Sequence, residues 1–156
     1  MRVLVDAGPL TTFKVLKVSM AEFQCLNGQS VSYVVLQYLA GSTNPPHTHS
    51  RSIELLFLLG GSLEVRFVDT TNKLFTQTFQ ASDLFVFPKG LVHYQFNGDT
   101  KKFAIAVSAF GSANAGTVSI PGAMFNTSIN DGILAKSFKI DVTTIQKIKA
   151  GLLPKA

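Results

Sequence analysis

Cysteine, histidine and tryptophan are scarce in this sequence, and it has no long apolar run. The single cysteine, Cys25, excludes an internal disulfide, which is mildly typical of a reducing compartment. No apolar run approaches the roughly 20 residues that a membrane-crossing helix needs. Met1 to Val5 is also too short for the apolar region of a signal peptide. We therefore expect no membrane span, in a chain that is either intracellular or a mature or trimmed form.

The net charge of +5 comes from basic residues that do not form a cluster. They are scattered from Arg2 to Lys155, with only a loose enrichment after Lys136. Nucleic-acid-binding domains gather lysine and arginine on one face or along one helix. We expect an ordinary basic surface and no nucleic-acid partner.

Short apolar runs separated by turn residues fill the middle of the chain. Leu63 to Val68 alternates residue by residue, as a strand with one buried face does. Gly60-Gly61 and Asn97-Gly98 are turn signals, and we expect the first to close a hairpin. The 156 residues, 46% of them apolar, predict one domain over residues 1–156. We expect an antiparallel sandwich or closed barrel over about residues 30–120.

The end of the chain has a different pattern. Asp131 and Asp141 each precede apolar residues at helical spacing, and aspartate is a common helix cap, while Gly151 can end the second helix. We expect two short amphipathic helices over about residues 128–153. Their apolar faces must be covered, and we favour a neighbouring subunit, so this tail is predicted to be an oligomerisation element.

Two of the three histidines lie one residue apart, five positions before a glutamate. In an extended segment, His47 and His49 would point to the same face. Glu54 opens an apolar run, where an unpaired carboxylate would be costly to bury. His93 could face the same interior from a neighbouring strand. A lone histidine is more often a hydrogen-bonded structural residue, but the agreement of these residue types favours a metal site.

Three imidazoles and one carboxylate would form an open site. In a six-coordinate ion they leave about two positions for water, dioxygen or a substrate. These ligand types allow Mn, Fe, Ni, Co or Zn, and the absence of thiolates disfavours a closed structural zinc site.

Two motifs carry a family resemblance. They are His47-Thr48-His49 with Glu54, and residues 83–93, which end in His93. They resemble the two cupin motifs of plant germins and germin-like proteins, and the similarity extends from about Val31 to Ala156. The resemblance implies an all-β jelly-roll barrel (cupin) with short C-terminal α-helices. It also implies one manganese ion bound by those four residues and a hexamer, a trimer of dimers held partly by the helices.

Family activities include superoxide dismutation and, in true germins, oxidation of oxalate by dioxygen. The family pattern places two asparagines near the metal to hold oxalate. Asn44 matches one of them, while the other position carries Val34, whose side chain cannot donate a hydrogen bond. Because a missing polar partner discriminates strongly between substrates, the resemblance favours a manganese-dependent, superoxide dismutase-like oxidoreductase over an oxalate oxidase.

Two other kinds of function stay open. One is a lyase, isomerase or cyclase that holds a plant metabolite in the barrel pocket, and the other is a non-catalytic binding or storage protein. Besides Asn44, the expected substrate contacts are Phe57, Phe87 and Phe96. Aromatic residues at such positions are more often ordinary barrel core. The expected partners are superoxide or a small organic molecule, and further copies of the chain in a trimer or hexamer.

The resemblance implies a secreted, apoplastic glycoprotein. Asn126-Thr127-Ser128 is a glycosylation sequon, although such triplets occur often by chance. Germin-like proteins usually begin with a signal peptide and a disulfide-closed segment, which are not found in this sequence, so an intracellular location also stays open.

Overall fold

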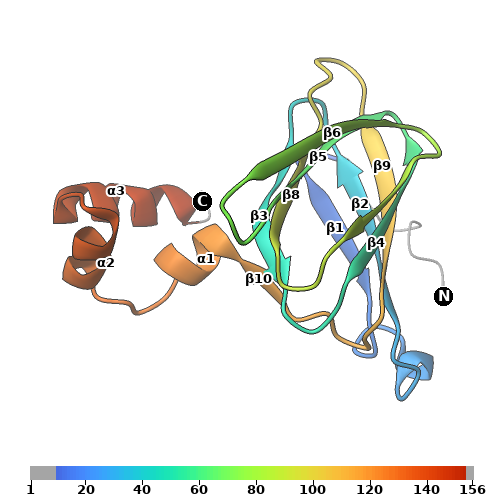
Figure 1. Ribbon diagram of the computed structural model, residues 1–156, viewed down its shortest axis with the longest axis horizontal. Helices are drawn as coiled ribbons and strands as arrows, with labels where there is room; N and C mark the ends of the chain where they lie inside the picture. The colour runs from blue at the N-terminus through green and yellow to red at the C-terminus, as the bar shows by residue number, and fades with distance from the viewer. Residues whose placement is uncertain (1–9, 154–156) are drawn as a thin grey trace. The chain divides into compact units, whose positions relative to one another are not determined.

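A computed structural model describes residues 10–153 of the chain (Figure 1). The stretch Met1–Val5 and the end of the resemblance at Ala156 lie outside this range. The strands are β1 (Lys14–Val18), β2 (Ser32–Tyr38), β3 (Thr43–His49), β4 (Glu54–Gly60), β5 (Ser62–Val68), β6 (Leu74–Gln80), β7 (Leu84–Phe87), β8 (Val92–Phe96), β9 (Ala104–Phe110) and β10 (Thr117–Ser119). The helices are a short 3-10 turn (Gln24–Leu26), α1 (Ile120–Phe125), α2 (Asp131–Phe138) and α3 (Val142–Leu152). By its contacts the chain divides into two compact units after Thr117.

The first unit is the predicted jelly-roll barrel. One sheet has the strand order β1-β2-β9-β4-β7, and the other has the order β10-β3-β8-β5-β6. Figure 1 shows the two sheets facing each other around a common interior. The predicted range of about 30–120 omits β1, which pairs with β2 along its whole length.

Alternation along the strands decides which side chains fill the barrel. In β4, Glu54, Leu56 and Leu58 are buried while the residues between them are more exposed. The core is a cluster of fully or nearly fully buried side chains from both sheets: Leu36, Tyr38, Leu56, Leu58, Leu63, Val65, Phe79, Phe87, Ala104 and Ala106. A glutamate at the start of such an inward-facing row is placed in the interior by the same period of two that buries the leucines.

The turn at Gly60-Gly61 does not close a hairpin, contrary to the prediction. Strands β4 and β5 belong to opposite sheets, so this turn carries the chain across the barrel. Gly61 has φ +83°, and a Cβ there would lie 2.6 Å from the carbonyl oxygen of Phe103. Glycine is therefore needed at this position for two reasons: the backbone of Phe103 approaches too closely for a Cβ, and the backbone of residue 61 is left-handed.

The second unit consists of helices packed on their own small core. Leu134, Ala135 and Ile145 are buried against Phe125 and Ile129. The cap of α2 is Asn130, not Asp131, because its side chain accepts from the backbone amides of Gly132 and Ile133.

Helix α3 begins as the sequence predicts but ends later. Asp141 caps its first turn. The helix runs past Gly151 to Leu152. Among the described residues, no helix is long and apolar enough to cross a membrane.

Candidate metal centre

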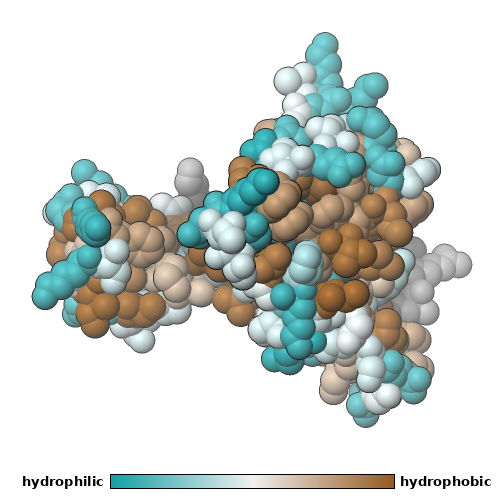
Figure 2. All heavy atoms as spheres, viewed as in Figure 1, coloured by the Kyte–Doolittle hydropathy of each residue, from teal (hydrophilic) through white to brown (hydrophobic). Residues whose placement is uncertain are grey.

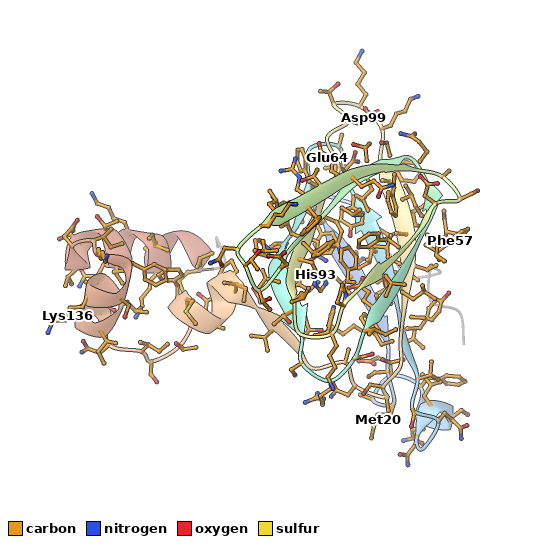
Figure 3. All side chains as sticks on the ribbon, viewed as in Figure 1. Met20, Phe57, Glu64, His93, Asp99 and Lys136 are labelled. Atoms are coloured by element: carbon orange, nitrogen blue, oxygen red, sulfur yellow. The ribbon has the colours of Figure 1, made fainter. Side chains whose placement is uncertain are left out.

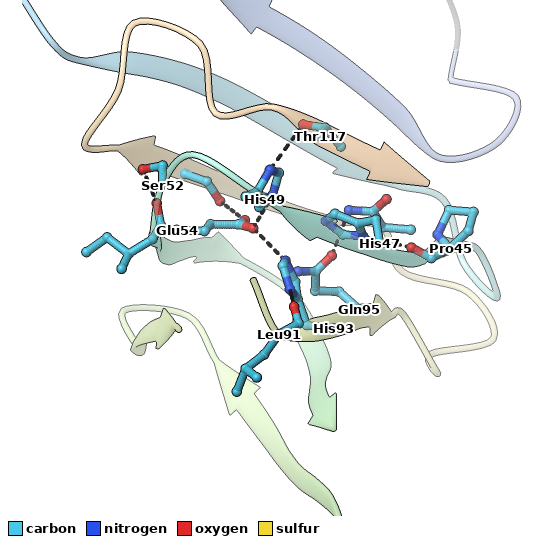
Figure 4. Close-up of polar contacts among 12 residues, drawn as sticks. Pro45, His47, His49, Ser52, Glu54, Leu91, His93, Gln95 and Thr117 are labelled. Atoms are coloured by element: carbon cyan, nitrogen blue, oxygen red, sulfur yellow. Dashed lines mark hydrogen bonds and ion pairs between the residues drawn. The ribbon is translucent and has the colours of Figure 1, made fainter. Parts of the chain in front are cut away.

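Three strands bring the four predicted ligands together. His47 and His49 lie on β3, His93 on β8 and Glu54 at the start of β4. His47 and His93 are direct cross-strand partners, while Glu54 enters from the opposite sheet. All four side chains are buried, and one ligand atom of each lies within 4.8 Å of the others. Figure 3 shows His93 inside the barrel, and Figure 4 shows the group in close-up.

The carboxylate of Glu54 is the centre of the group. Its Oε2 lies 3.0 Å from Nε2 of His49 and 3.0 Å from Nε2 of His93. Its Oε1 accepts a hydrogen bond of 2.6 Å from the hydroxyl of Ser108, a fully buried residue of β9. Three groups from both sheets therefore fix the position of this one side chain.

Each imidazole has a polar partner at its Nδ1 atom. His47 Nδ1 donates to the carbonyl oxygen of Pro45 at 2.7 Å, and His93 Nδ1 donates to that of Leu91 at 2.9 Å. His49 Nδ1 lies 3.1 Å from the hydroxyl of Thr117. A carbonyl can only accept, so Nδ1 carries the proton in the first two rings, and Nε2 keeps its lone pair.

These residues fit a metal ion. In His93 the lone pair of Nε2 faces a carboxylate oxygen of Glu54 at 3.0 Å, and two acceptors repel each other unless a cation or a second proton lies between them. A divalent ion supplies that charge, and outer partners on Nδ1 are the usual support of histidine ligands. His47, His49, His93 and Glu54 are the residues that would hold the ion.

The protonation states also suit a metal. Burial raises the pKa of Glu54, but its close contacts with His49, His93 and Ser108 outweigh burial and hold that pKa well below its usual range. Burial, followed by the neighbouring His93, lowers the pKa of His47 from 6.5 to about 4. At neutral pH the group thus contains a carboxylate and a neutral His47, the forms in which these side chains coordinate metals.

Acid should therefore weaken the fold of the chelator-treated protein. The unfolded chain takes up a proton on His47 near pH 6.5, and the folded protein does so only near pH 4. Stability is therefore lost as the pH falls through this window, by about 3 kcal/mol for a difference of this size. The lowered pKa of Glu54 acts in the same direction at still lower pH. Urea unfolding at pH 7 and pH 4 measures the change, and equal stability at both would contradict it.

The outer partners should matter for metal affinity. In Ser108→Ala, Glu54 loses its hydrogen bond to Oε1, and we expect metal to bind about 10- to 100-fold more weakly, the usual effect of losing such a partner. Ser32→Ala is the matched control, because Ser32 is also buried but donates to the carbonyl of Ser112 instead. Competition titration with a chromogenic chelator measures both, and equal affinities in the two variants would contradict this role of Ser108.

A cavity of about 200 Å³ adjoins three of the four predicted ligands, His47, His49 and Glu54. Its wall is formed by Val15, Lys17, Val34, Leu36, Asn44, His47, His49, Glu54, Phe110 and Thr117. Asn44 and Val34, the two positions that the family pattern assigns to substrate, both line it. On one side the group is therefore packed in the barrel, and on the other it borders a space of small-molecule size.

A β-bulge explains how Asn44 reaches the cavity. Residues 44 and 47 would face opposite sides of a regular strand, but β3 shifts register against β8 between Asn44 and His47, where Pro45 and Pro46 lie. The extra residue turns Asn44 to the same side as His47. Its Nδ2 donates to Oε1 of Gln95 at 2.7 Å, and the hydroxyl of the buried Tyr38 donates to the same oxygen at 3.3 Å.

The predicted aromatic contacts occupy other places. Phe87 is buried, and its ring stacks on His93 with the centroids 4.3 Å apart. Phe57 and Phe96 alternate with inward-facing residues, so they lie on the opposite strand faces from Glu54 and His93; Figure 3 shows Phe57 at the edge of the barrel. None of the three lines the cavity. Asn126 is exposed at the end of α1.

The comparisons with known proteins agree with this geometry. The family model described as Cupin matches residues 11–146. Germin-like protein 9-3 of Oryza sativa subsp. japonica is 62% identical over 146 residues, which are 94% of this chain and 68% of that protein. The chain belongs to the germin-like cupins.

A second relative and a solved structure are also similar to this germin-like cupin. Germin-like protein 9-1 of Oryza sativa subsp. japonica is 47% identical over 151 residues, covering 96% of this chain and 61% of that protein. The chain spans about two thirds of the length of these curated relatives. A solved oxalate oxidase in complex with the substrate analogue glycolate superposes with a TM-score of 0.93 at 29% identity. It covers all of this chain, which spans 81% of that one.

Proposed function

We propose that this germin-like cupin is a manganese-dependent oxidoreductase of the superoxide dismutase type. The observation that carries the proposal is the buried group of three histidines and one glutamate beside a cavity of about 200 Å³. A site with this donor set has coordination positions left for a small ligand, and the cavity offers room for one.

In this proposal the metal and the protein residues have different roles. Bound manganese would supply one-electron redox chemistry, which dismutation needs in both directions. The chain holds the ligands through the outer partners Pro45, Leu91 and Thr117. The apolar wall residues Val34 and Phe110 limit the water in the cavity. Asn44, which donates a hydrogen bond to Gln95, places a neutral polar group in the cavity wall.

Oxidation of a small carboxylate is the second candidate. The specific observation in its favour is the likeness to solved oxalate oxidases, one of them in complex with glycolate. Val34 lines the cavity where the family pattern has an asparagine, so one expected hydrogen bond to oxalate is missing. We therefore place dismutation first.

Assembly and location are part of the proposal. We infer a homo-oligomer, a trimer or hexamer, in which the tail over about residues 128–153 contacts a neighbouring subunit. Ile133 and Phe138 of α2 are 60% and 47% exposed, and Figure 2 shows apolar side chains at the surface of the helical unit. A secreted location and glycosylation at the exposed Asn126 would follow the family. Size-exclusion chromatography with light scattering tests the assembly.

The activity test compares protein-bound with free manganese. Protein loaded with one manganese per chain should dismutate superoxide faster than an equal concentration of free manganese ion, in a stopped-flow or pulse-radiolysis assay. The variant Glu54→Gln, treated in the same way and desalted, should lose the excess activity. Full occupancy with no activity above the free ion would rule out the dismutase proposal.

A further inference from the structure

Among residues 10–153, one cation lines the cavity beside the metal centre. It is the side chain of Lys17, on the edge strand β1. The remaining wall residues are apolar, neutral and polar, or members of the ligand group. This positive group is a feature of the cavity that neither the ligands nor the core requires.

The pairing of β1 with β2 fixes where this lysine lies. Lys17 is the direct cross-strand partner of Val34, and Val15 is that of Leu36. Val15 and Lys17 share one face of β1 by the two-residue period, and both line the cavity. The cation therefore lies beside the wall position at which an asparagine amide is replaced by Val34.

The ammonium group is available to a ligand. Lys17 is exposed, so its stem can line the wall while its charge stays hydrated. Across residues 10–153, no carboxylate forms an ion pair with it. The pKa of Glu22 is lowered chiefly by hydrogen bonds from Ser19, and the charge of Lys17 is a lesser cause. The Glu22 carboxylate accepts those hydrogen bonds from the amide and hydroxyl of Ser19.

The charges of the cavity favour an anion. Glu54 is the one acidic residue among the described residues of the wall, and its oxygens are in contact with Ser108 and two imidazoles. Low-dielectric walls focus the field of a charge at the mouth of a cleft and raise the local concentration of oppositely charged ligands. Val15, Val34 and Leu36 supply such walls around Lys17.

We propose that Lys17 guides small oxygen anions to the metal centre and makes the cavity selective for them. The inference rests on the proposed function, since it names the substrate class of the same site. Superoxide and small monocarboxylates share the required chemistry, a compact negative charge on oxygen. Neutral molecules of the same size gain nothing from Lys17.

The first test measures the rate with superoxide. Lys17→Met removes the cation, and Lys14→Met is the matched control, because it removes the same charge from the opposite face of the same strand. In manganese-loaded protein at low ionic strength, Lys17→Met should lower the second-order rate constant on the order of tenfold. It should also remove most of the ionic-strength dependence, because screening acts on this charge. Lys14→Met should stay within about twofold of the parent, and Lys17→Arg should retain most of the rate.

A second readout does not depend on turnover. Isothermal titration of the manganese-loaded proteins with sodium formate should show about tenfold weaker binding in Lys17→Met than in Lys14→Met. If formate binding differs in this way while no variant dismutates superoxide, the anion-guiding role holds and the proposed function fails. If the two variants match each other in both rate and formate affinity, the role of Lys17 is overturned, whether or not the parent is a dismutase.

Discussion

Replacing Glu54 by glutamine is expected to weaken manganese binding at least about a hundredfold, beyond the usual effect of losing an outer partner. The substitution keeps the size of the side chain but removes the one negative charge of the ligand group. Desalted Glu54→Gln should then contain little metal by plasma emission spectroscopy, while the parent keeps one ion per chain.

The matched control for this variant is Glu64→Gln. Glu64 lies on β5 and pairs with Arg66, at about 28% side-chain exposure, so its loss changes the net charge equally without touching the buried group. Its metal content should equal that of the parent. Circular dichroism and the unfolding midpoint show whether Glu54→Gln is folded. A folded Glu54→Gln with full metal content would contradict the assigned ligand role.

Replacing Val34 by asparagine is expected to increase the affinity for oxalate roughly thirtyfold. Val34 and Asn44 both line the cavity, and an amide at position 34 can donate a hydrogen bond to a carboxylate bound there. A hydrogen bond to a charged group contributes about 2 kcal/mol, which corresponds to that factor. Oxalate titration of the manganese-loaded protein measures the affinity, and dioxygen consumption shows whether oxidation follows.

The control for this gain is Val34→Leu, because leucine has nearly the shape of asparagine without its amide. It should leave oxalate binding within about twofold of the parent or weaken it by filling the cavity. If the leucine and asparagine variants behave alike, Val34 does not decide the discrimination against oxalate.

The ligand group could be predicted from the sequence because its spacing carries a geometric consequence. A period of two places His47 and His49 on one face of any strand, and Glu54 starts an inward-facing row that continues with Leu56 and Leu58. The turn residues and alternation likewise predicted an all-β barrel. These patterns are local, whereas the place of His93 beside His47 depends on the pairing of β3 with β8.

The remaining features depend on which strands become neighbours. The Gly60-Gly61 turn joins strands of opposite sheets, and sequence pattern alone does not separate such a turn from a hairpin. Ser108 is an ordinary residue of an alternating strand until β9 is placed beside β4. Lys17 lies on a short strand before the predicted barrel range, and only its pairing with Val34 brings it to the cavity.

The most direct test of the account is anomalous diffraction from crystals of protein loaded with manganese. Data collected on either side of the manganese absorption edge should show one strong peak per chain, in contact with His47, His49, His93 and Glu54 together. A fully loaded protein whose peak lies elsewhere, or is absent while these four side chains keep the contacts described here, would contradict the metal centre and every function built on it.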